Sequence, residues 1–212
     1  MGPRTMDSLL QQRSGNWVAA LREFVGERAA PVERCELCGI WIGEGHEHLL
    51  EPETRRLLCT CQPCALLFAS REGRRYRRVP RDVARLDFHL TDPQWEGFQI
   101  PINLAFFVRS SRTGRVFAMY PGPAGATEST LDLEAWDEIA GANPALERLE
   151  DDVEALLVNR MNGARECYRV PIDRCYQLVG LIRSRWHGSR GRDGAHEAIA
   201  HFFTALDEEI GA

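Results

Sequence analysis

The alternation of apolar and polar positions is clearest in the middle of the chain, near residues 100–123. Two apolar, aromatic-rich runs, IPINLAFFVRS and VFAMYPGP, flank a short polar turn that contains Gly114. Apolar runs of this length around a glycine turn are typical of a β-hairpin. We therefore expect a central hairpin, followed by a loop of sequence PGPAGATEST that shows no periodicity.

Apolar residues at helical spacing predict helices on both sides of this hairpin. Before it, the segment that begins near Trp17 has this spacing, and Pro31 ends it. After the strand ARECYRVPI, Asp173 is expected to cap a helix of sequence RCYQLVGLIRSRW. Three further helices are predicted, at LDLEAWDEIAGA, NPALERLEDDVEALLVNRM and AHEAIAHFFTALDEEI.

A cysteine-rich stretch, Arg34 to Phe68, lies between the first helix and the hairpin. Its apolar runs IWI and LLCTC predict short strands, and CQPCALLFAS predicts a turn that opens a helix. Strand, turn and helix in this order indicate a zinc-ribbon or treble-clef-like module.

These patterns together predict an α+β protein. We expect an N-terminal helical segment at residues 1–30, a cysteine metal-binding module at 31–70 and an arginine-rich connector at 71–86. The remaining residues, 87–212, are expected to form an α+β body with the central β-hairpin and C-terminal helices.

The composition is that of an ordinary soluble globular protein, with 44% apolar and 27% charged residues. The net charge of -5 argues against a nucleic-acid-binding surface over the whole protein. No apolar run approaches the ~18 residues of a membrane helix, and the N-terminus lacks the pattern of a signal peptide. The seven cysteines are odd in number and five lie in one stretch, which argues against a disulfide framework. We expect a cytoplasmic protein without membrane insertion.

Two C-x-x-C pairs carry the strongest chemical signal: Cys35 with Cys38, and Cys61 with Cys64. Thiolates separated by two residues can bind one metal ion. Two such pairs supply the four soft ligands of a tetrahedral Zn(II) or Fe(II) centre. Gly39 suits the left-handed backbone that follows such a turn. We expect a structural Zn(II), with rubredoxin-like iron, or a labile site that hands its metal on or senses redox state, as alternatives.

The same stretch holds surplus ligands: Cys59, His46 and His48. Side chains two apart on a strand point the same way, so Cys59 and Cys61 are expected to share a face, as are the two histidines. Either one of the three replaces a cysteine of the four, with Cys59 the best substitute, or all three are packing residues outside the first ligand shell.

A run of arginines follows the module, from Arg71 to Arg85. It is either a solvated face that pairs with acidic residues between Glu128 and Glu154, or a surface that contacts nucleic acid. The Pro/Gly loop is either a connector or a recognition loop. The candidate partner-binding residues are Arg74, Arg75, Arg77, Arg78, Pro121, Gly122 and Gly125.

Catalytic motifs are absent from the sequence: there is no phosphate-binding loop, no Gly-x-Ser-x-Gly elbow and no dinucleotide fingerprint. Cys167 and Cys175 are expected to be buried structural thiols. The spacing of His196 and His201 does not fit a helical metal pair. The cysteine pairs with histidines between them resemble the frame of His-Asn-His nucleases, but no histidine follows Cys64 in the expected helix. We therefore assign no catalytic residues.

The chain also resembles a family of unknown function from actinobacteria and their relatives, whose members are encoded beside uptake NiFe-hydrogenase genes. The motifs that carry the resemblance are RCELCG, HEHLLEP, LLCTCQPCALLF, LAFF, YPGPAGATES, DVEALLVNR and VPIDRCYQLVGLIR with the W-x-G that follows. The resemblance implies a role in hydrogenase assembly, metal handling or electron transfer.

We therefore expect a zinc-binding accessory protein that docks on a protein partner, and the resemblance points to a hydrogenase subunit. The alternative is a zinc-containing regulator that binds nucleic acid through the stretch Arg71–Arg85. Binding to nucleic acid should weaken steeply with added salt, whereas docking on a protein should survive nuclease treatment.

Overall fold

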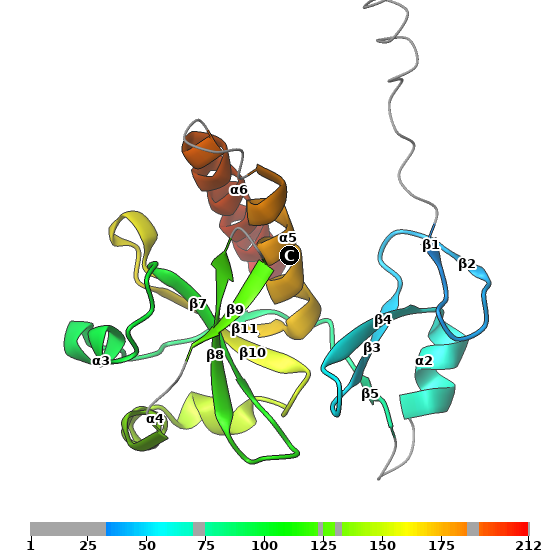
Figure 1. Ribbon diagram of the computed structural model, residues 1–212, viewed down its shortest axis with the longest axis horizontal. Helices are drawn as coiled ribbons and strands as arrows, with labels where there is room; N and C mark the ends of the chain where they lie inside the picture. The colour runs from blue at the N-terminus through cyan, green and yellow to red at the C-terminus, as the bar shows by residue number, and fades with distance from the viewer. Residues whose placement is uncertain (1–32, 70–74, 123–124, 130–132, 186–190, 212) are drawn as a thin grey trace, which may run out of the picture.

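The computed structural model describes residues 33–69, 75–122, 125–129, 133–185 and 191–211 (Figure 1). The predicted N-terminal helix lies outside these residues. The described chain forms two packed parts, which we call the cysteine module (residues 33–79) and the body (residues 84–211).

The cysteine module consists of a strand pair, a three-stranded sheet and one helix. The strand predicted at IWI, the strand predicted at LLCTC and the helix after the second cysteine pair are all confirmed. The elements are β1 (Glu33–Arg34), β2 (Trp41–Ile42), β3 (Glu47–Glu51), β4 (Arg56–Thr60), α2 (Gln62–Ala69) and β5 (Arg77–Arg78). Strand β3 lies between β4 and β5, and all pairings are antiparallel.

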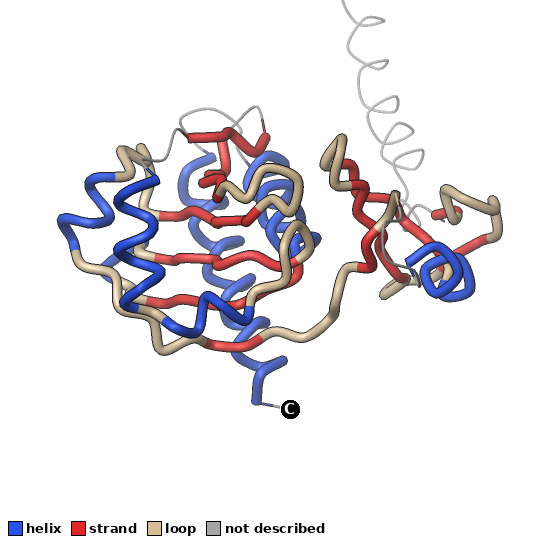
Figure 2. The backbone as a smooth tube through the Cα atoms, turned by 90° about the horizontal axis from the view of Figure 1, so that it is seen from below, coloured by secondary structure: helices blue, strands red, loops and turns tan. Residues whose placement is uncertain are grey.

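The body is built on a six-stranded sheet in the order β6-β11-β10-β7-β8-β9 with antiparallel neighbours. Its strands are β6 (Ala84–Arg85), β7 (Leu104–Arg109), β8 (Val116–Gly122), β9 (Gly125–Ser129), β10 (Glu154–Asn159) and β11 (Glu166–Pro171). The helices are α3 (Asp92–Gly97), α4 (Leu133–Ala142), α5 (Ile172–Arg185), α6 (Gly191–Gly211) and the 3-10 turns η2 (Pro144–Arg148) and η3 (Met161–Gly163). Figure 2 shows the strands side by side with helices around them.

The sheet of the body is apolar on both faces, because successive side chains on each strand point to opposite sides. Phe106 and Leu157 pack with residues of α5 and α6 on one face. Their sequence neighbours Phe107 and Leu156 pack on the other face, where Trp136 of α4 stacks on Phe107 at 5.2 Å between ring centroids. The body therefore has two apolar cores, one on each side of the sheet.

The prediction of one long helix over NPALERLEDDVEALLVNRM is wrong. Its first part forms η2, and residues Glu154–Asn159 form β10, a central strand. All six residues of β10 are buried, because it has neighbours at both edges and a core on each face. A strand buried on both faces is continuously apolar, so periodicity cannot distinguish it from a helix.

The predicted hairpin is confirmed as β7 and β8, but the loop expected after it is wrong. Strand β8 runs through Gly122, and β9 turns back to pair with it, with Gly122 opposite Gly125. Backbone pairing forms this hairpin despite the Pro/Gly-rich sequence. Helix α5 begins at Ile172, so Asp173 lies in its first turn rather than at the cap.

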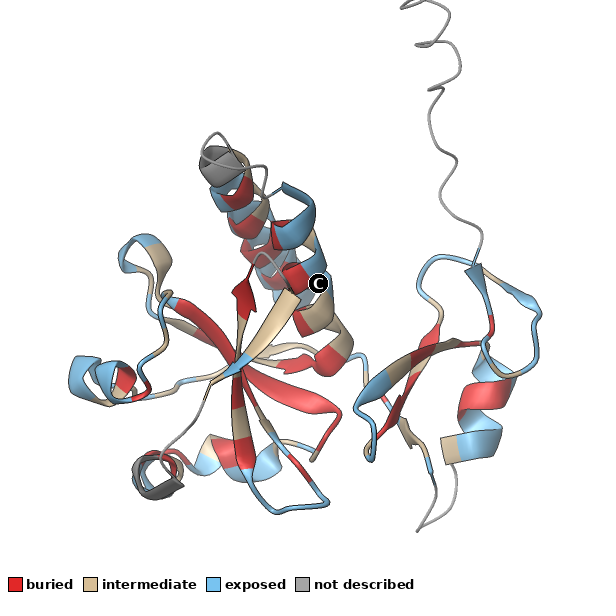
Figure 3. Ribbon diagram, viewed as in Figure 1, coloured by how far each residue is buried: buried red, intermediate tan, exposed pale blue. Residues whose placement is uncertain are grey.

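The module packs on the body through residues of β3, β5 and the turn after β3. Leu50 and Val79 join the core between the sheet and α5. Arg55 forms an ion pair with Glu128 at 2.9 Å, and Arg77 forms one with Asp152 at 3.3 Å. Figure 3 shows the buried strands of both parts. The arginine-rich segment thus supplies β5 to the module and leads into β6 of the body.

Candidate metal centre

The first cysteine pair lies in the tight turn between β1 and β2. The backbone amide of Gly39 donates to the carbonyl of Cys35 at 2.8 Å, and the amide of Cys35 donates to the carbonyl of Ile40 at 2.8 Å. Gly39 has φ +75°, the left-handed conformation that the sequence predicted. The turn is held against β4 because the amide of Glu36 donates to the carbonyl of Cys59 at 2.9 Å.

The second cysteine pair opens helix α2. Cys61 directly precedes the helix, and the amide of Ala65 donates to the carbonyl of Cys61 at 2.9 Å. Cys64 therefore lies one helical turn from Cys61, with Pro63 in the first turn, where its missing N–H costs no hydrogen bond. This local geometry turns both thiols toward the first pair.

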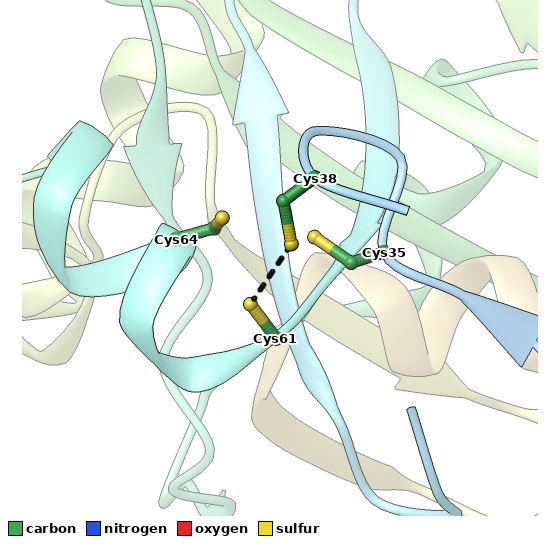
Figure 4. A group of neighbouring side chains, drawn as sticks. All are labelled: Cys35, Cys38, Cys61 and Cys64. Atoms are coloured by element: carbon green, nitrogen blue, oxygen red, sulfur yellow. Dashed lines mark hydrogen bonds between the residues drawn. The ribbon is translucent and has the colours of Figure 1, made fainter. Parts of the chain in front are cut away.

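The four sulfur atoms of Cys35, Cys38, Cys61 and Cys64 all lie within 4.8 Å of one another (Figure 4). The sulfur atoms of Cys38 and Cys61 are 3.7 Å apart. Zn–S bonds of ~2.3 Å place two sulfurs of a tetrahedron ~3.8 Å apart, so this spacing fits a shared metal ion. All seven cysteines of the chain are free thiols, so no disulfide competes for them.

The thiols of this group differ in acidity. Burial raises the pKa of Cys35, but hydrogen bonds from the backbone of Cys61, Cys38 and Leu37 outweigh it and lower the pKa to about 6. Burial and the neighbouring thiols raise the pKa of Cys64. Backbone amides thus stabilise one thiolate, whereas ionising all four thiols requires a cation among them.

The surplus ligands form a second group. His46, His48 and Cys59 each place one ligand atom within 4.8 Å of the others. The two histidines share a face as predicted, with ring centroids 4.7 Å apart. The expectation that Cys59 shares a face with Cys61 is wrong, because β4 ends at Thr60 and the chain then turns into the second cysteine pair. The structure therefore groups Cys59 with the histidines.

The arginines of the run that the structure describes form ion pairs within the protein. Arg75 pairs with Glu51, Arg77 with Asp152, and Arg78 with Glu47. Arg81 also pairs with Glu47, and Arg85 pairs with Glu166 and Asp207. The predicted acidic stretch 128–154 supplies partners for Arg77 alone among these arginines: Asp152, and Glu150 at 4.0 Å. The other carboxylates lie outside that stretch. Arg71 and Arg74 lie outside the described residues.

The candidate contact residues at the Pro/Gly segment belong to the sheet. Pro121 and Gly122 are buried in β8, and Gly125 is half-buried in β9, the edge strand. A partner that binds here would therefore meet the edge of β9 first.

The remaining cysteines lie in the body. Cys167 is buried, and burial raises its pKa to about 12. Cys175 is fully buried, and its pKa is raised well above the ordinary value by burial. Both thiols are therefore protonated and packed in the core. Among the described residues, no helix combines the length and apolar character needed to cross a membrane.

Sequence reasoning missed two features of the module. Glu33 and Asp173 lie beside the histidine group, at 3.3 Å from His46 and 2.8 Å from His48. Asp173 comes from a distant helix, so no local spacing could reveal it. The second feature is a set of exposed apolar side chains: Ile40, Trp41, Leu66, Leu67 and Phe68. For the last three, the run of consecutive apolar residues in the short helix α2 could have indicated this exposure.

Comparison with known proteins gives a family and no relative of assigned activity. The sequence profile of DUF5947, described as a family of unknown function, matches residues 34–210. No curated protein and no solved structure matches the chain.

Proposed function

The chain belongs to the DUF5947 family of unknown function, and we propose from its site that it is a zinc-binding accessory protein that docks on a protein partner. In this proposal the four cysteines hold one structural Zn(II), and the module that the ion stabilises presents an apolar surface to the partner. The observation that carries the metal assignment is the convergence of four thiols with tetrahedral spacing.

Zinc is proposed as the ion because a closed four-thiolate shell is the usual structural zinc site and Zn(II) is redox-inactive. A four-thiolate iron centre has the same geometry and is distinguished by its visible absorbance. The order of a cysteine turn, a β-hairpin and a helix that begins at the second cysteine pair supports a treble-clef-like module. Strands β1 and β2 have two residues each, so few backbone hydrogen bonds hold the first turn, and a bound ion would tie that turn to α2. Bound Zn(II) contributes about 10–16 kcal/mol in small modules of this kind.

The docking surface is proposed at the end of the module away from the body, where Figures 1 and 2 show β2 and α2. Trp41 is 57% exposed and Leu66 is 51% exposed. Apolar side chains this exposed and gathered in one small module are typical of an interaction site. The guanidinium carbon of Arg34 lies 3.6 Å from the centroid of the Trp41 ring. Tryptophan and arginine are both common in interface hot spots.

The partner class is proposed to be a subunit of a NiFe-hydrogenase, with a role in assembly, maturation or electron transfer. This part rests on the sequence resemblance described above. The edge strand β9, with Gly125, is a proposed second contact. The ion pairs of the described arginines weigh against the rival function of nucleic-acid binding, because those guanidinium groups already contact carboxylates.

The experiment measures binding of the zinc-loaded full chain to purified large and small hydrogenase subunits, by titration calorimetry. The double variant Trp41→Ala/Leu66→Ala removes the exposed apolar groups, and Ile210→Ala is the matched control because Ile210 is also exposed, at 38%, but lies on α6. We expect the double variant to weaken binding at least tenfold and the control to bind like the wild type.

Equal binding by wild type and double variant would overturn the proposed surface. Absence of binding to either subunit would overturn the hydrogenase assignment. Deletion of residues 1–32 is tested alongside, because tighter binding after deletion would show that the chain's own N-terminal segment competes for the same surface. Binding to DNA that falls steeply with salt would favour the nucleic-acid alternative.

A further inference from the structure

His46 carries a buried nitrogen, Nε2, that makes no hydrogen bond within the described residues and has the carboxylate of Glu33 3.3 Å away. Its Nδ1 lies 3.0 Å from the carbonyl oxygen of Gly43, which can only accept, so Nδ1 is a donor and Nε2 is the nitrogen that can bind a metal ion. A buried polar atom that makes no hydrogen bond destabilises the fold, so the placement of this nitrogen beside Glu33 calls for an explanation.

His48 is held in the same way. Its Nδ1 lies 2.8 Å from the carboxylate of Asp173, which leaves Nε2 available as a ligand. Asp173 is itself fixed, because the amide of Arg174 donates to its other oxygen at 2.8 Å. A carboxylate that orients a histidine through Nδ1–H is the usual arrangement around zinc-binding histidines.

Cys59 lies directly opposite His48 in the pairing of β3 and β4. Its sulfur completes a set of three ligand atoms that lie within 4.8 Å of one another. Glu33 adds a fourth group, because its carboxylate oxygen lies 3.3 Å from Nε2 of His46. Nitrogen and oxygen ligands at ~2.0–2.1 Å from zinc lie ~3.3 Å apart at the corners of a tetrahedron. Glu33 also acts on Cys59, whose thiol pKa is raised by burial first and then by this carboxylate.

We propose that the chain has a second Zn(II) site, formed by His46, His48 and Cys59 with Glu33 as the fourth ligand. Two imidazoles, one thiolate and one carboxylate are a donor set that zinc accepts. The ion would satisfy the lone pair of His46 and bring the three ligand atoms closer together.

The alternation of β3 and β4 separates this second site from the four-cysteine site. Leu49 and Leu58 lie opposite each other on one face of this sheet, whereas His48 and Cys59 lie on the other face, toward Asp173 in the first turn of α5. The second ion would therefore lie at the junction of module and body. It would fix the module against α5 through the contact between His48 and Asp173.

A groove lies against the two histidines of the second site. His46 and His48 line a groove of about 510 Å³ between the module and α5, together with Arg81 and Tyr176. Zn(II) could reach the two histidines from this groove and then bind the deeper ligands.

The test counts zinc in the full chain after reconstitution with Zn(II) under reducing conditions and removal of loosely bound metal. We expect two zinc ions per wild-type chain, and one in each of His46→Gln and Cys59→Ser. The matched control is His196→Gln, an exposed histidine of α6, which should keep both ions. Cobalt(II) substitution identifies the ion that remains, because charge-transfer intensity scales with the number of thiolates bound: four in the first site and one in the second.

Asp173→Asn provides a variant that leaves all proposed ligands intact. We expect its second site to bind Zn(II) about 10–100-fold more weakly, the usual cost of losing such an orienting carboxylate, with the four-thiolate site unchanged. One zinc per wild-type chain, unaffected by His46→Gln, would overturn the proposal. Loss of the four-thiolate cobalt spectrum in folded Cys59→Ser would also overturn it, because Cys59 would then belong to the first site. Loss of that spectrum in Cys61→Ser alone concerns only the four-cysteine site.

Discussion

Replacing Leu50 with alanine should loosen the module from the body without weakening the four-cysteine site. Leu50 belongs to β3, but its side chain is 3% exposed and lies in the core between the sheet and α5. It lines a small cavity of about 40 Å³ with Phe106, Met119 and Tyr176. Truncation therefore enlarges an existing void at the junction.

The magnitude follows from the burial. Leu→Ala changes in cores cost about 2–5 kcal/mol, of which the cavity contributes ~24 cal/mol per Å³. Because the turn after β3 is close by, the neighbouring residues can partly fill the enlarged void. We therefore expect Leu50→Ala to lower the free energy of unfolding by about 3 kcal/mol. That is a large part of the ~5–15 kcal/mol stability of a typical domain.

The assay is urea denaturation followed by circular dichroism, with hydrogen exchange to locate the change. The matched control is Leu49→Ala, the neighbouring residue, which is fully buried but faces α2 within the module. Leu50→Ala should speed exchange at the junction and keep zinc affinity, whereas Leu49→Ala should lower zinc affinity. The packing argument would be refuted if Leu50→Ala changed the free energy of unfolding by less than ~0.5 kcal/mol, or if both variants lost zinc affinity equally.

Two further predictions concern metal removal and pH. Chelation of zinc should abolish exchange protection in β3 and β4 while β10 stays protected, and equal loss in both parts would contradict this separation. Hydrogen bonds from Arg78 hold the pKa of Glu47 below its usual value. A carboxyl group with a lowered folded pKa stabilises the protein above its unfolded pKa and loses that effect as pH falls. Glu47→Gln should therefore cost about 1–3 kcal/mol at pH 7 and progressively less below about pH 4, measured by urea denaturation at each pH; a cost independent of pH would contradict the assignment.

The four-cysteine site was predictable from sequence because its chemistry is local. Each pair lies within one turn, and two thiols separated by two residues in a tight turn point to the same side of it. The same reasoning failed two residues before the second motif. Cys59 belongs to β4, so its side chain follows strand alternation, whereas Cys61 lies after the end of β4 at Thr60 and follows the turn.

The body was harder to predict because the sequence of its central strand, β10, is equally compatible with a buried helix. Glu154–Asn159 is buried on both faces, so the apolar run carries no period of two. Likewise, the contact of Asp173 with His48 depends on how α5 packs against the module. Long-range contacts of this kind have no spacing in the sequence from which they could be inferred.

The most direct test of the central claim is the metal content and visible absorbance of the chain purified without added metal, for wild type and for Cys61→Ser. We expect a colourless zinc protein that loses the ion of its four-cysteine site in Cys61→Ser, together with the exchange protection of β3 and β4. Iron with thiolate charge-transfer bands in the wild type, or unchanged zinc content in Cys61→Ser, would contradict the structural zinc centre.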